Sequence, residues 1–108
     1  MAKKSLELLT ETMFYVLMAF VREERCGIEI VQFVEAKTGG RVRLGPGTLY
    51  AILSKFEEEG LIREVAVSGR KRTYRLTTRG YELYREEVER LRNCLMDAES
   101  EGTVWRNE

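Results

Sequence analysis

The sequence predicts a mainly α-helical fold with one small β-hairpin, followed by a single long C-terminal helix. Three successive patterns in the spacing of apolar residues lead to this prediction. Apolar residues recur at helical spacing up to Gly60, alternate between Leu61 and Leu76, and follow a heptad seam from Tyr81 onward. The 108 residues, of which 44% are hydrophobic and 33% charged, are enough for one small globular domain. Because such a domain buries a limited share of its surface, dimerisation is a natural source of further stability.

The first helix is expected to begin after Thr10, whose hydroxyl can cap it. The run from Met13 to Val21 is apolar almost all round, and charged residues end it from Glu23 onward. A helix of this kind needs cover from neighbouring elements or from a partner subunit. The run is too short to cross a bilayer. We therefore expect a core helix that also contributes Phe14 and Leu17 to a dimer interface.

The second helix is expected from Gly27 to Thr38, where Gly39 and Gly40 stop it. Its apolar spacing predicts one buried face, formed by Ile28, Ile30, Val31 and Val34. Residues 41–44 alternate charged with apolar side chains, which predicts a very short strand. With the helix that follows, three helices are separated by short glycine-marked turns, an order compatible with a helix-turn-helix.

The central helix is expected at residues 46–59, with Pro46 in its first turn and Gly60 at its left-handed C-terminal cap. Its buried stripe is predicted to consist of Leu49, Ile52, Leu53 and Phe56. The opposite face carries small, hydroxyl-bearing or basic residues, which a helix needs if it is to enter a major groove. We predict groove contacts for Thr48, Tyr50, Ser54 and Lys55. The alternative is an ordinary amphipathic helix with a polar face.

The segment after Gly60 predicts a hairpin with strands at residues 61–67 and 72–76 and a turn at Ser68 and Gly69. Its tip, residues 67–73, carries Arg70, Lys71 and Arg72 in succession. These cations are either solvated or meant for a partner, because a hairpin of this kind cannot bury its tip. A groove-binding helix followed directly by a basic hairpin is the order of a winged helix-turn-helix, whose wing contacts phosphates or the minor groove.

The distribution of charge also indicates a polyanionic partner. The formal net charge of the chain is zero, but the segment from Lys37 to Arg79 holds ten cations and four acids. The middle of the chain therefore carries +6 and the flanks carry −6, which is a footprint for a polyanion. We add Arg41 and Arg43 to the candidates for phosphate or minor-groove contacts, and we predict double-stranded DNA as the partner.

The last helix, residues 78–99, is expected to be capped by Thr77 or Thr78. Its apolar residues step by three and four along a heptad seam of Tyr81, Tyr84, Val88, Leu91, Leu95 and Ala98. About 20 residues make a helix of roughly 30 Å, longer than so small a domain needs for its own cover. We predict dimer contacts through Tyr81, Tyr84, Val88, Leu91 and Leu95. The alternative is an intramolecular fourth helix.

These boundaries predict a winged-helix DNA-binding domain at residues 1–77, a dimerisation helix at 78–99 and a disordered tail at 100–108. Within the tail, Trp105 is either a docked anchor or a disordered side chain.

The chain lacks the residues of several other classes of site. Cys26 and Cys94 stand far apart, without a CxxC pair and without any histidine, so we expect no metal site, no disulfide and no cofactor. We expect both thiols to be reduced and buried, as in a cytoplasmic protein. With no histidine, no phosphate-binding glycine loop and no evident carboxylate pair, we expect no enzyme. Glu7 and Glu11 interrupt any signal-peptide core.

Several segments of the chain resemble the PadR family of winged-helix transcriptional regulators. They are LTETMFYVLMAF, then CGIEIVQFVEAKTGGRVRLGPGTLYAILSKFEEEGLI, then GRKRTYRLTTRG, and the resemblance covers roughly residues 8–92. The most specific parts are LGPGTLY, EEEGLI and the GRKRTYRLTTRG wing. The resemblance implies a homodimer, built through the first and last helices, that binds a palindromic operator and represses transcription. It also implies release from DNA by a small aromatic or drug-like effector.

Three features of the chain limit what the resemblance implies. The chain ends after one long helix, so it is similar to the short type of the family. That helix has no tryptophan, which puts in doubt the flat-drug pocket of some short members. At the start of the second helix, residues 25–28 read Arg-Cys-Gly-Ile where the family commonly has His-Gly-Tyr.

A different class of function, a winged-helix module that binds an acidic protein, stays open at this point.

Overall fold

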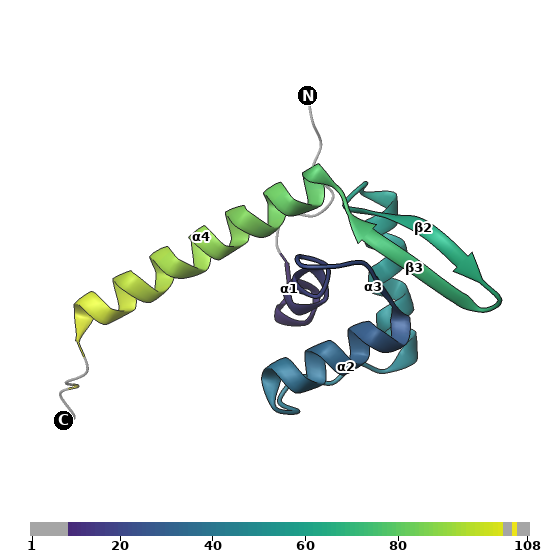
Figure 1. Ribbon diagram of the computed structural model, residues 1–108. Helices are drawn as coiled ribbons and strands as arrows, with labels where there is room; N and C mark the ends of the chain where they lie inside the picture. Colours follow the sequence, from purple (N-terminus) through teal and green to yellow (C-terminus); the bar gives the residue numbers. More distant parts are fainter. Residues whose placement is uncertain (1–8, 103–104, 106–108) are drawn as a thin grey trace.

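The computed structural model describes residues 9–102 and residue 105. Three short helices and a three-stranded antiparallel sheet form the body, and one long helix leaves it (Figure 1). In chain order the elements are α1 (Glu11–Met18), β1 (Arg25–Cys26), α2 (Gly27–Thr38), α3 (Pro46–Glu58), β2 (Ile62–Ser68), β3 (Lys71–Leu76) and α4 (Thr78–Glu101). The sheet order is β1-β3-β2. The predicted winged helix-turn-helix with a long C-terminal helix is confirmed.

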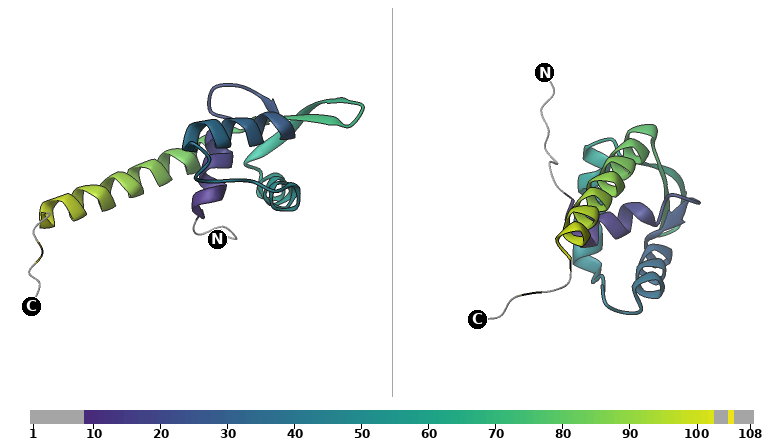
Figure 2. Two further views of the ribbon diagram at one scale, coloured as in Figure 1. Left: turned by 90° about the horizontal axis from the view of Figure 1, so that it is seen from below. Right: turned by 90° about the vertical axis from the view of Figure 1, so that its left-hand side faces the viewer.

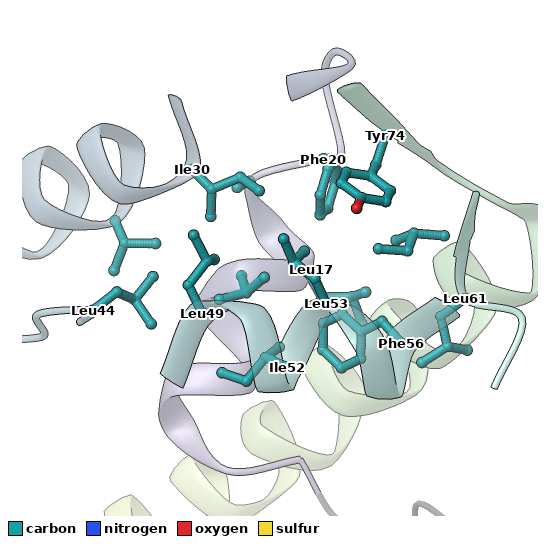
Figure 3. Packing of buried hydrophobic residues seen from close by; sticks show 14 of the residues in the cluster. Leu17, Phe20, Ile30, Leu44, Leu49, Ile52, Leu53, Phe56, Leu61 and Tyr74 are labelled. Atoms are coloured by element: carbon teal, nitrogen blue, oxygen red, sulfur yellow. The ribbon is translucent and has the colours of Figure 1, made fainter. Parts of the chain in front are cut away.

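The core lies where α1, α2, α3 and the sheet meet, and their side chains point toward one another there (Figure 3). The stripe predicted for α3 is buried throughout, with Phe56 fully covered and Leu49, Ile52 and Leu53 at most 8% exposed. At about 25 cal/mol per Å² of apolar surface, burial of these four side chains is the main force that holds α3 against the body.

The starts of α1 and α3 and the end of α2 follow the predicted signals. The Thr10 hydroxyl accepts a hydrogen bond from the Met13 amide at 3.1 Å, and Pro46 is in the first turn of α3. Gly39 ends α2 with φ at 62°, a left-handed conformation that glycine adopts without steric penalty. The local chemistry of the sequence therefore determines where these helices begin and where α2 ends.

Three local predictions were wrong, and one strand was not predicted. α1 ends at Met18, before the apolar run does, and Ile28 is 64% exposed although its spacing predicted a buried position. Residues 41–44 form no strand, because no other strand lies beside them. Val42 and Leu44 instead reach the core from a loop. The sheet gains its third strand from β1, which pairs with β3 through Arg25 opposite Tyr74.

The wing turn is shifted by one residue from its predicted position. Ser68 pairs with Lys71 across the hairpin, so Gly69 and Arg70 form a two-residue turn, and Gly69 takes φ at 63°. A bulge between Glu64 and Ala66 adds one residue to β2.

Near the C-terminus, α4 continues to Glu101, two residues beyond the predicted end. Trp105 is 77% exposed and therefore is not docked on the described part of the chain. The rest of the predicted tail, residues 103–104 and 106–108, lies outside the described residues.

The start of α4 is anchored tightly at the junction between α3 and β2. The Thr77 amide donates to the Leu61 carbonyl at 3.0 Å, and the Thr77 hydroxyl donates to the Gly60 carbonyl at 2.7 Å. The same hydroxyl accepts from the Gly80 amide at 3.0 Å and so caps α4. These bonds determine the direction in which α4 leaves the body.

Beyond its first turns, α4 packs against little of its own chain. Phe14 of α1 stacks on Tyr84 with ring centroids 5.4 Å apart, but every residue from Glu89 to Gly102 is exposed. The radius of gyration is 16.3 Å, against about 13 Å for a compact domain of this length. In Figure 2, α4 and the wing point in opposite directions.

Gly80→Ala should destabilise the protein by about 2 kcal/mol or more, because a Cβ at this position would lie 2.1 Å from the Leu61 carbonyl oxygen. Urea denaturation followed by circular dichroism measures the loss. Gly47→Ala is the matched control, since a Cβ there meets no atom within 4 Å. It should change stability by no more than about 1 kcal/mol, in the stabilising direction. Equal effects of the two substitutions would contradict the tight junction.

Candidate nucleic-acid interface

The exposed face of α3 carries the side chains that were predicted to contact a groove. Thr48, Tyr50 and Ser54 are exposed, Tyr50 by 63%, and Lys55 is half-buried. The first turn of α3 holds no acid, and the acids begin only at Glu57. The N-terminal part of this face can therefore approach a phosphate backbone without repulsion from its own carboxylates.

The wing, residues 67–73, presents its cations at the end of a two-stranded ribbon. Arg70, Lys71 and Arg72 are all exposed, and the hairpin pairing of Ser68 with Lys71 sets their spacing. Among the residues that the structure describes, neither Arg70 nor Lys71 has a carboxylate oxygen within 4.0 Å. Arg72 differs, since its Nε lies 3.4 Å from Glu64 Oε2. Tyr74 and Glu64 together raise the pKa of Arg72.

The wing, α3 and the start of α2 surround one groove of about 420 Å³. Ile28 lines it from α2, Tyr50 from α3, and residues 70–72 from the wing. Side chains that are far apart in the sequence thus form one surface. The wing that borders it points away from the free end of α4 (Figure 2). Sequence reasoning missed Ile28, because its helical spacing predicted burial and no local signal places it beside the wing.

The two arginines before α3 have different surroundings. Arg41 forms an ion pair with Glu11, and its Nη2 donates to the Tyr15 hydroxyl at 3.1 Å. The hydrogen bond to Glu11 raises the pKa of Arg41. Arg43 is exposed and donates through Nε to the Gly40 carbonyl at 3.3 Å. Arg41 therefore binds side chains of α1, whereas the charge of Arg43 is exposed at the surface without a carboxylate partner among the described residues.

The residues predicted for a dimer interface fall into three groups. Leu17 has no exposed surface and belongs to the core of a single chain, so its assignment to the dimer interface was wrong. Phe14, Tyr84 and Val88 are partly covered within one chain. Tyr81, Leu91 and Leu95 are exposed by 46%, 40% and 58%.

Met96, 57% exposed, joins the exposed apolar residues at the free end of α4. It lies next to the heptad seam rather than on it, so the periodicity did not predict it.

Other expected features concern thiols, metals and membranes. Cys26 is buried, but Cys94 is exposed on α4, which corrects the expectation of two buried thiols. Among the described residues, no cluster of three or more histidine, cysteine or acidic side chains is placed to hold a metal ion. None of the helices in this part of the chain combines the length and apolar character needed to cross a membrane.

Residues 16–86 match the sequence pattern of the transcriptional regulator PadR-like family. The fold is similar to that of a transcriptional regulator from Clostridium thermocellum, with a TM-score of 0.74 and 19% identity over 89% of this chain and all of that one. It is also similar to Bacillus subtilis PadR in complex with operator DNA, with a TM-score of 0.62 and 21% identity over 70% of this chain and 45% of that one.

A curated sequence relative matches a shorter stretch. It is an uncharacterized 37.1 kDa protein in a transposon of Streptomyces fradiae, 44% identical over 46 residues. These residues are 43% of this chain, and the match spans 13% of the length of that relative.

Cations with and without a carboxylate partner should contribute differently to the binding of a duplex of random sequence. Replacing Arg70 and Lys71 by Ala should flatten the log–log salt dependence of the association constant by nearly two units, since each neutralised phosphate contributes about 0.9. Arg41→Ala should change the slope far less, because Glu11 already neutralises this guanidinium. Fluorescence anisotropy at several salt concentrations measures the slopes. An unchanged slope for the wing variant would remove the wing from the interface.

Proposed function

The chain belongs to the PadR-like family of transcriptional regulators, and from that premise we propose that it is a sequence-specific DNA-binding repressor that acts as a homodimer. The observation that carries the proposal is the shared surface of α3, the wing and the start of α2. Tyr50 of the exposed face of α3 lines the same groove as Arg70 and Lys71, two cations that have no carboxylate partner among the described residues. This combination suits a partner that has base edges and phosphates side by side.

In the proposed complex, α3 enters the major groove. Thr48, Tyr50 and Ser54 face the bases, while Lys55 and the wing bind the backbone or the adjacent minor groove. Arg43 adds a phosphate contact before the helix. The acids at the end of α3 lie away from the DNA, because the N-terminal residues of a recognition helix make the base contacts.

The proposed dimer is supported by the exposed seam of α4. A helix of 24 residues is about 36 Å long, and its second half is exposed along its whole length. The α4 of a second copy, together with the partner's α1, would cover this seam. In this arrangement residues 1–77 form the DNA-binding domain and residues 78–99 the dimerisation helix.

A two-fold dimer would read a palindromic operator whose half-sites are about one helical turn apart, or a multiple of it. Such a regulator would act in the cytoplasm, where its operator is accessible. We include release by a small aromatic effector in the proposal. Since α4 carries no tryptophan, any effector site would depend on residues such as Tyr81 and Tyr84, whose rings lie 6.4 Å apart.

Sequence-specific binding is tested by fluorescence anisotropy on the DNA upstream of the protein's own gene and on a scrambled duplex. We expect a preference of about a thousandfold or more for the native sequence. Tyr50→Ala and Ser54→Ala should reduce this preference, because they remove groove contacts and leave the wing intact. Equal, weak binding to both duplexes, with tight binding to an acidic protein, would support a protein-interaction module instead.

Dimerisation through α4 predicts that Leu91→Glu and Leu95→Glu together convert the protein to a monomer, since two carboxylates would be buried without partners. Sedimentation velocity at micromolar concentration measures the change. The matched control places the same two charges on the opposite side of the helix, with Asn93→Glu and Ser100→Glu. A control variant that dissociates equally would show that net charge, and not the seam, decides the oligomeric state.

A further inference from the structure

One carboxylate, that of Glu64, forms an ion pair with a cation of the wing, Arg72. Glu64 is in β2, opposite Tyr74 of β3 and directly before the bulge. Arg72 and Tyr74 are two residues apart in β3, so their side chains leave the same face of the hairpin as that of Glu64. Both Arg72 and Tyr74 line the groove beside α3. Glu64 itself does not line this groove, whose lining includes one acid, Glu29, but it lies beside the guanidinium of Arg72, which does.

The contact between Glu64 and Arg72 is an ion pair without a hydrogen bond. Glu64 Oε2 lies 3.4 Å from Arg72 Nε, and the same oxygen is buried with no hydrogen-bond partner in the described part of the chain. A buried carboxylate oxygen in this state is unfavourable unless a cation stays beside it. Arg72 is the residue that supplies this charge, and its side chain is still 64% exposed.

A DNA phosphate would compete with Glu64 for the same guanidinium. If Arg72 stays with Glu64, it is already neutralised and contributes little to the release of counterions from DNA. If Arg72 turns to a phosphate, it leaves the buried oxygen of a half-buried carboxylate unpaired and close to the negative backbone. Either arrangement makes Arg72 a weaker phosphate contact than Arg70 or Lys71.

We propose that Glu64 is a positioning residue that holds Arg72 back from DNA and so limits the affinity of the wing. The inference rests on the proposed function, because it assumes that the wing binds the backbone. Glu64 would restrain binding to every sequence alike, since phosphates carry no sequence information. Only Arg70 and Lys71 of the wing would then bind phosphates at full strength. The complex with DNA would therefore dissociate faster than the three consecutive cations of the wing suggest.

Glu64→Gln should raise the affinity for a random duplex at 0.1 M salt by about fivefold to tenfold and steepen the log–log salt slope by up to about 0.9. The matched control is Glu58→Gln, which removes an equal charge from an exposed acid of α3 that forms no ion pair in the described structure. Fluorescence anisotropy of the full chain over a range of salt concentrations measures both variants. Equal effects of the two substitutions, or weaker binding by Glu64→Gln, would overturn the proposal.

A double-mutant cycle tests whether Glu64 acts through Arg72. In an Arg72→Ala background, Glu64→Gln should have no more effect than Glu58→Gln. Arg72→Ala alone should flatten the salt slope by much less than Arg70→Ala does, and this comparison holds even if the Glu64 variant fails to fold. Equal slopes for the two arginine variants would contradict the inference.

The same experiments separate this inference from the proposed function. If replacing Arg70 and Lys71 leaves binding unchanged, the wing does not bind DNA and the proposed interface fails. If that replacement weakens binding as expected while Glu64→Gln does not strengthen it, only the role of Glu64 is wrong.

Discussion

The arrangement of the molecule depends on the close contact between the first turn of α4 and the Leu61 carbonyl. Thr77 binds the backbone of residues 60 and 61 through both its amide and its hydroxyl, and Gly80 has no side chain because none would fit. This junction ties the end of α3 to the end of β3. It therefore determines the direction of α4 and the position of the wing relative to α3.

The fold sorts the charges of the basic middle segment into two groups. Arg41, Arg72 and Arg75 each lie within 4.0 Å of a carboxylate, whereas Arg70 and Lys71 have no such partner among the described residues. A count of charges in the sequence gives these five cations equal weight. The segment charge of +6 already subtracts Glu64 but not Glu11 and Glu24, the partners of Arg41 and Arg75. Because a paired cation releases fewer counterions from DNA, the structure predicts an electrostatic contribution smaller than +6 suggests.

Helix α1 contacts both the core of the body and the first turns of α4. Leu17 lies in the core with α2 and α3, while Phe14 stacks on Tyr84 of α4. One short helix thus holds the DNA-binding body and the base of the long helix in a fixed relation. A ligand or partner that displaced Phe14 or Tyr84 would act on both parts at once, since the two rings are in direct contact.

By itself, the sequence determined the order of the four helices and the hairpin, the capping residues and the buried stripe of α3. These features depend on neighbours within about one or two helical turns, so Thr10, Pro46 and the Leu49-to-Phe56 spacing predicted them. Only the tertiary structure decided that β1 forms, that Leu17 is core and Ile28 surface, and that Glu64 forms an ion pair with Arg72. Each of these depends on which distant segment comes to lie beside the residue, and local spacing carries no such information.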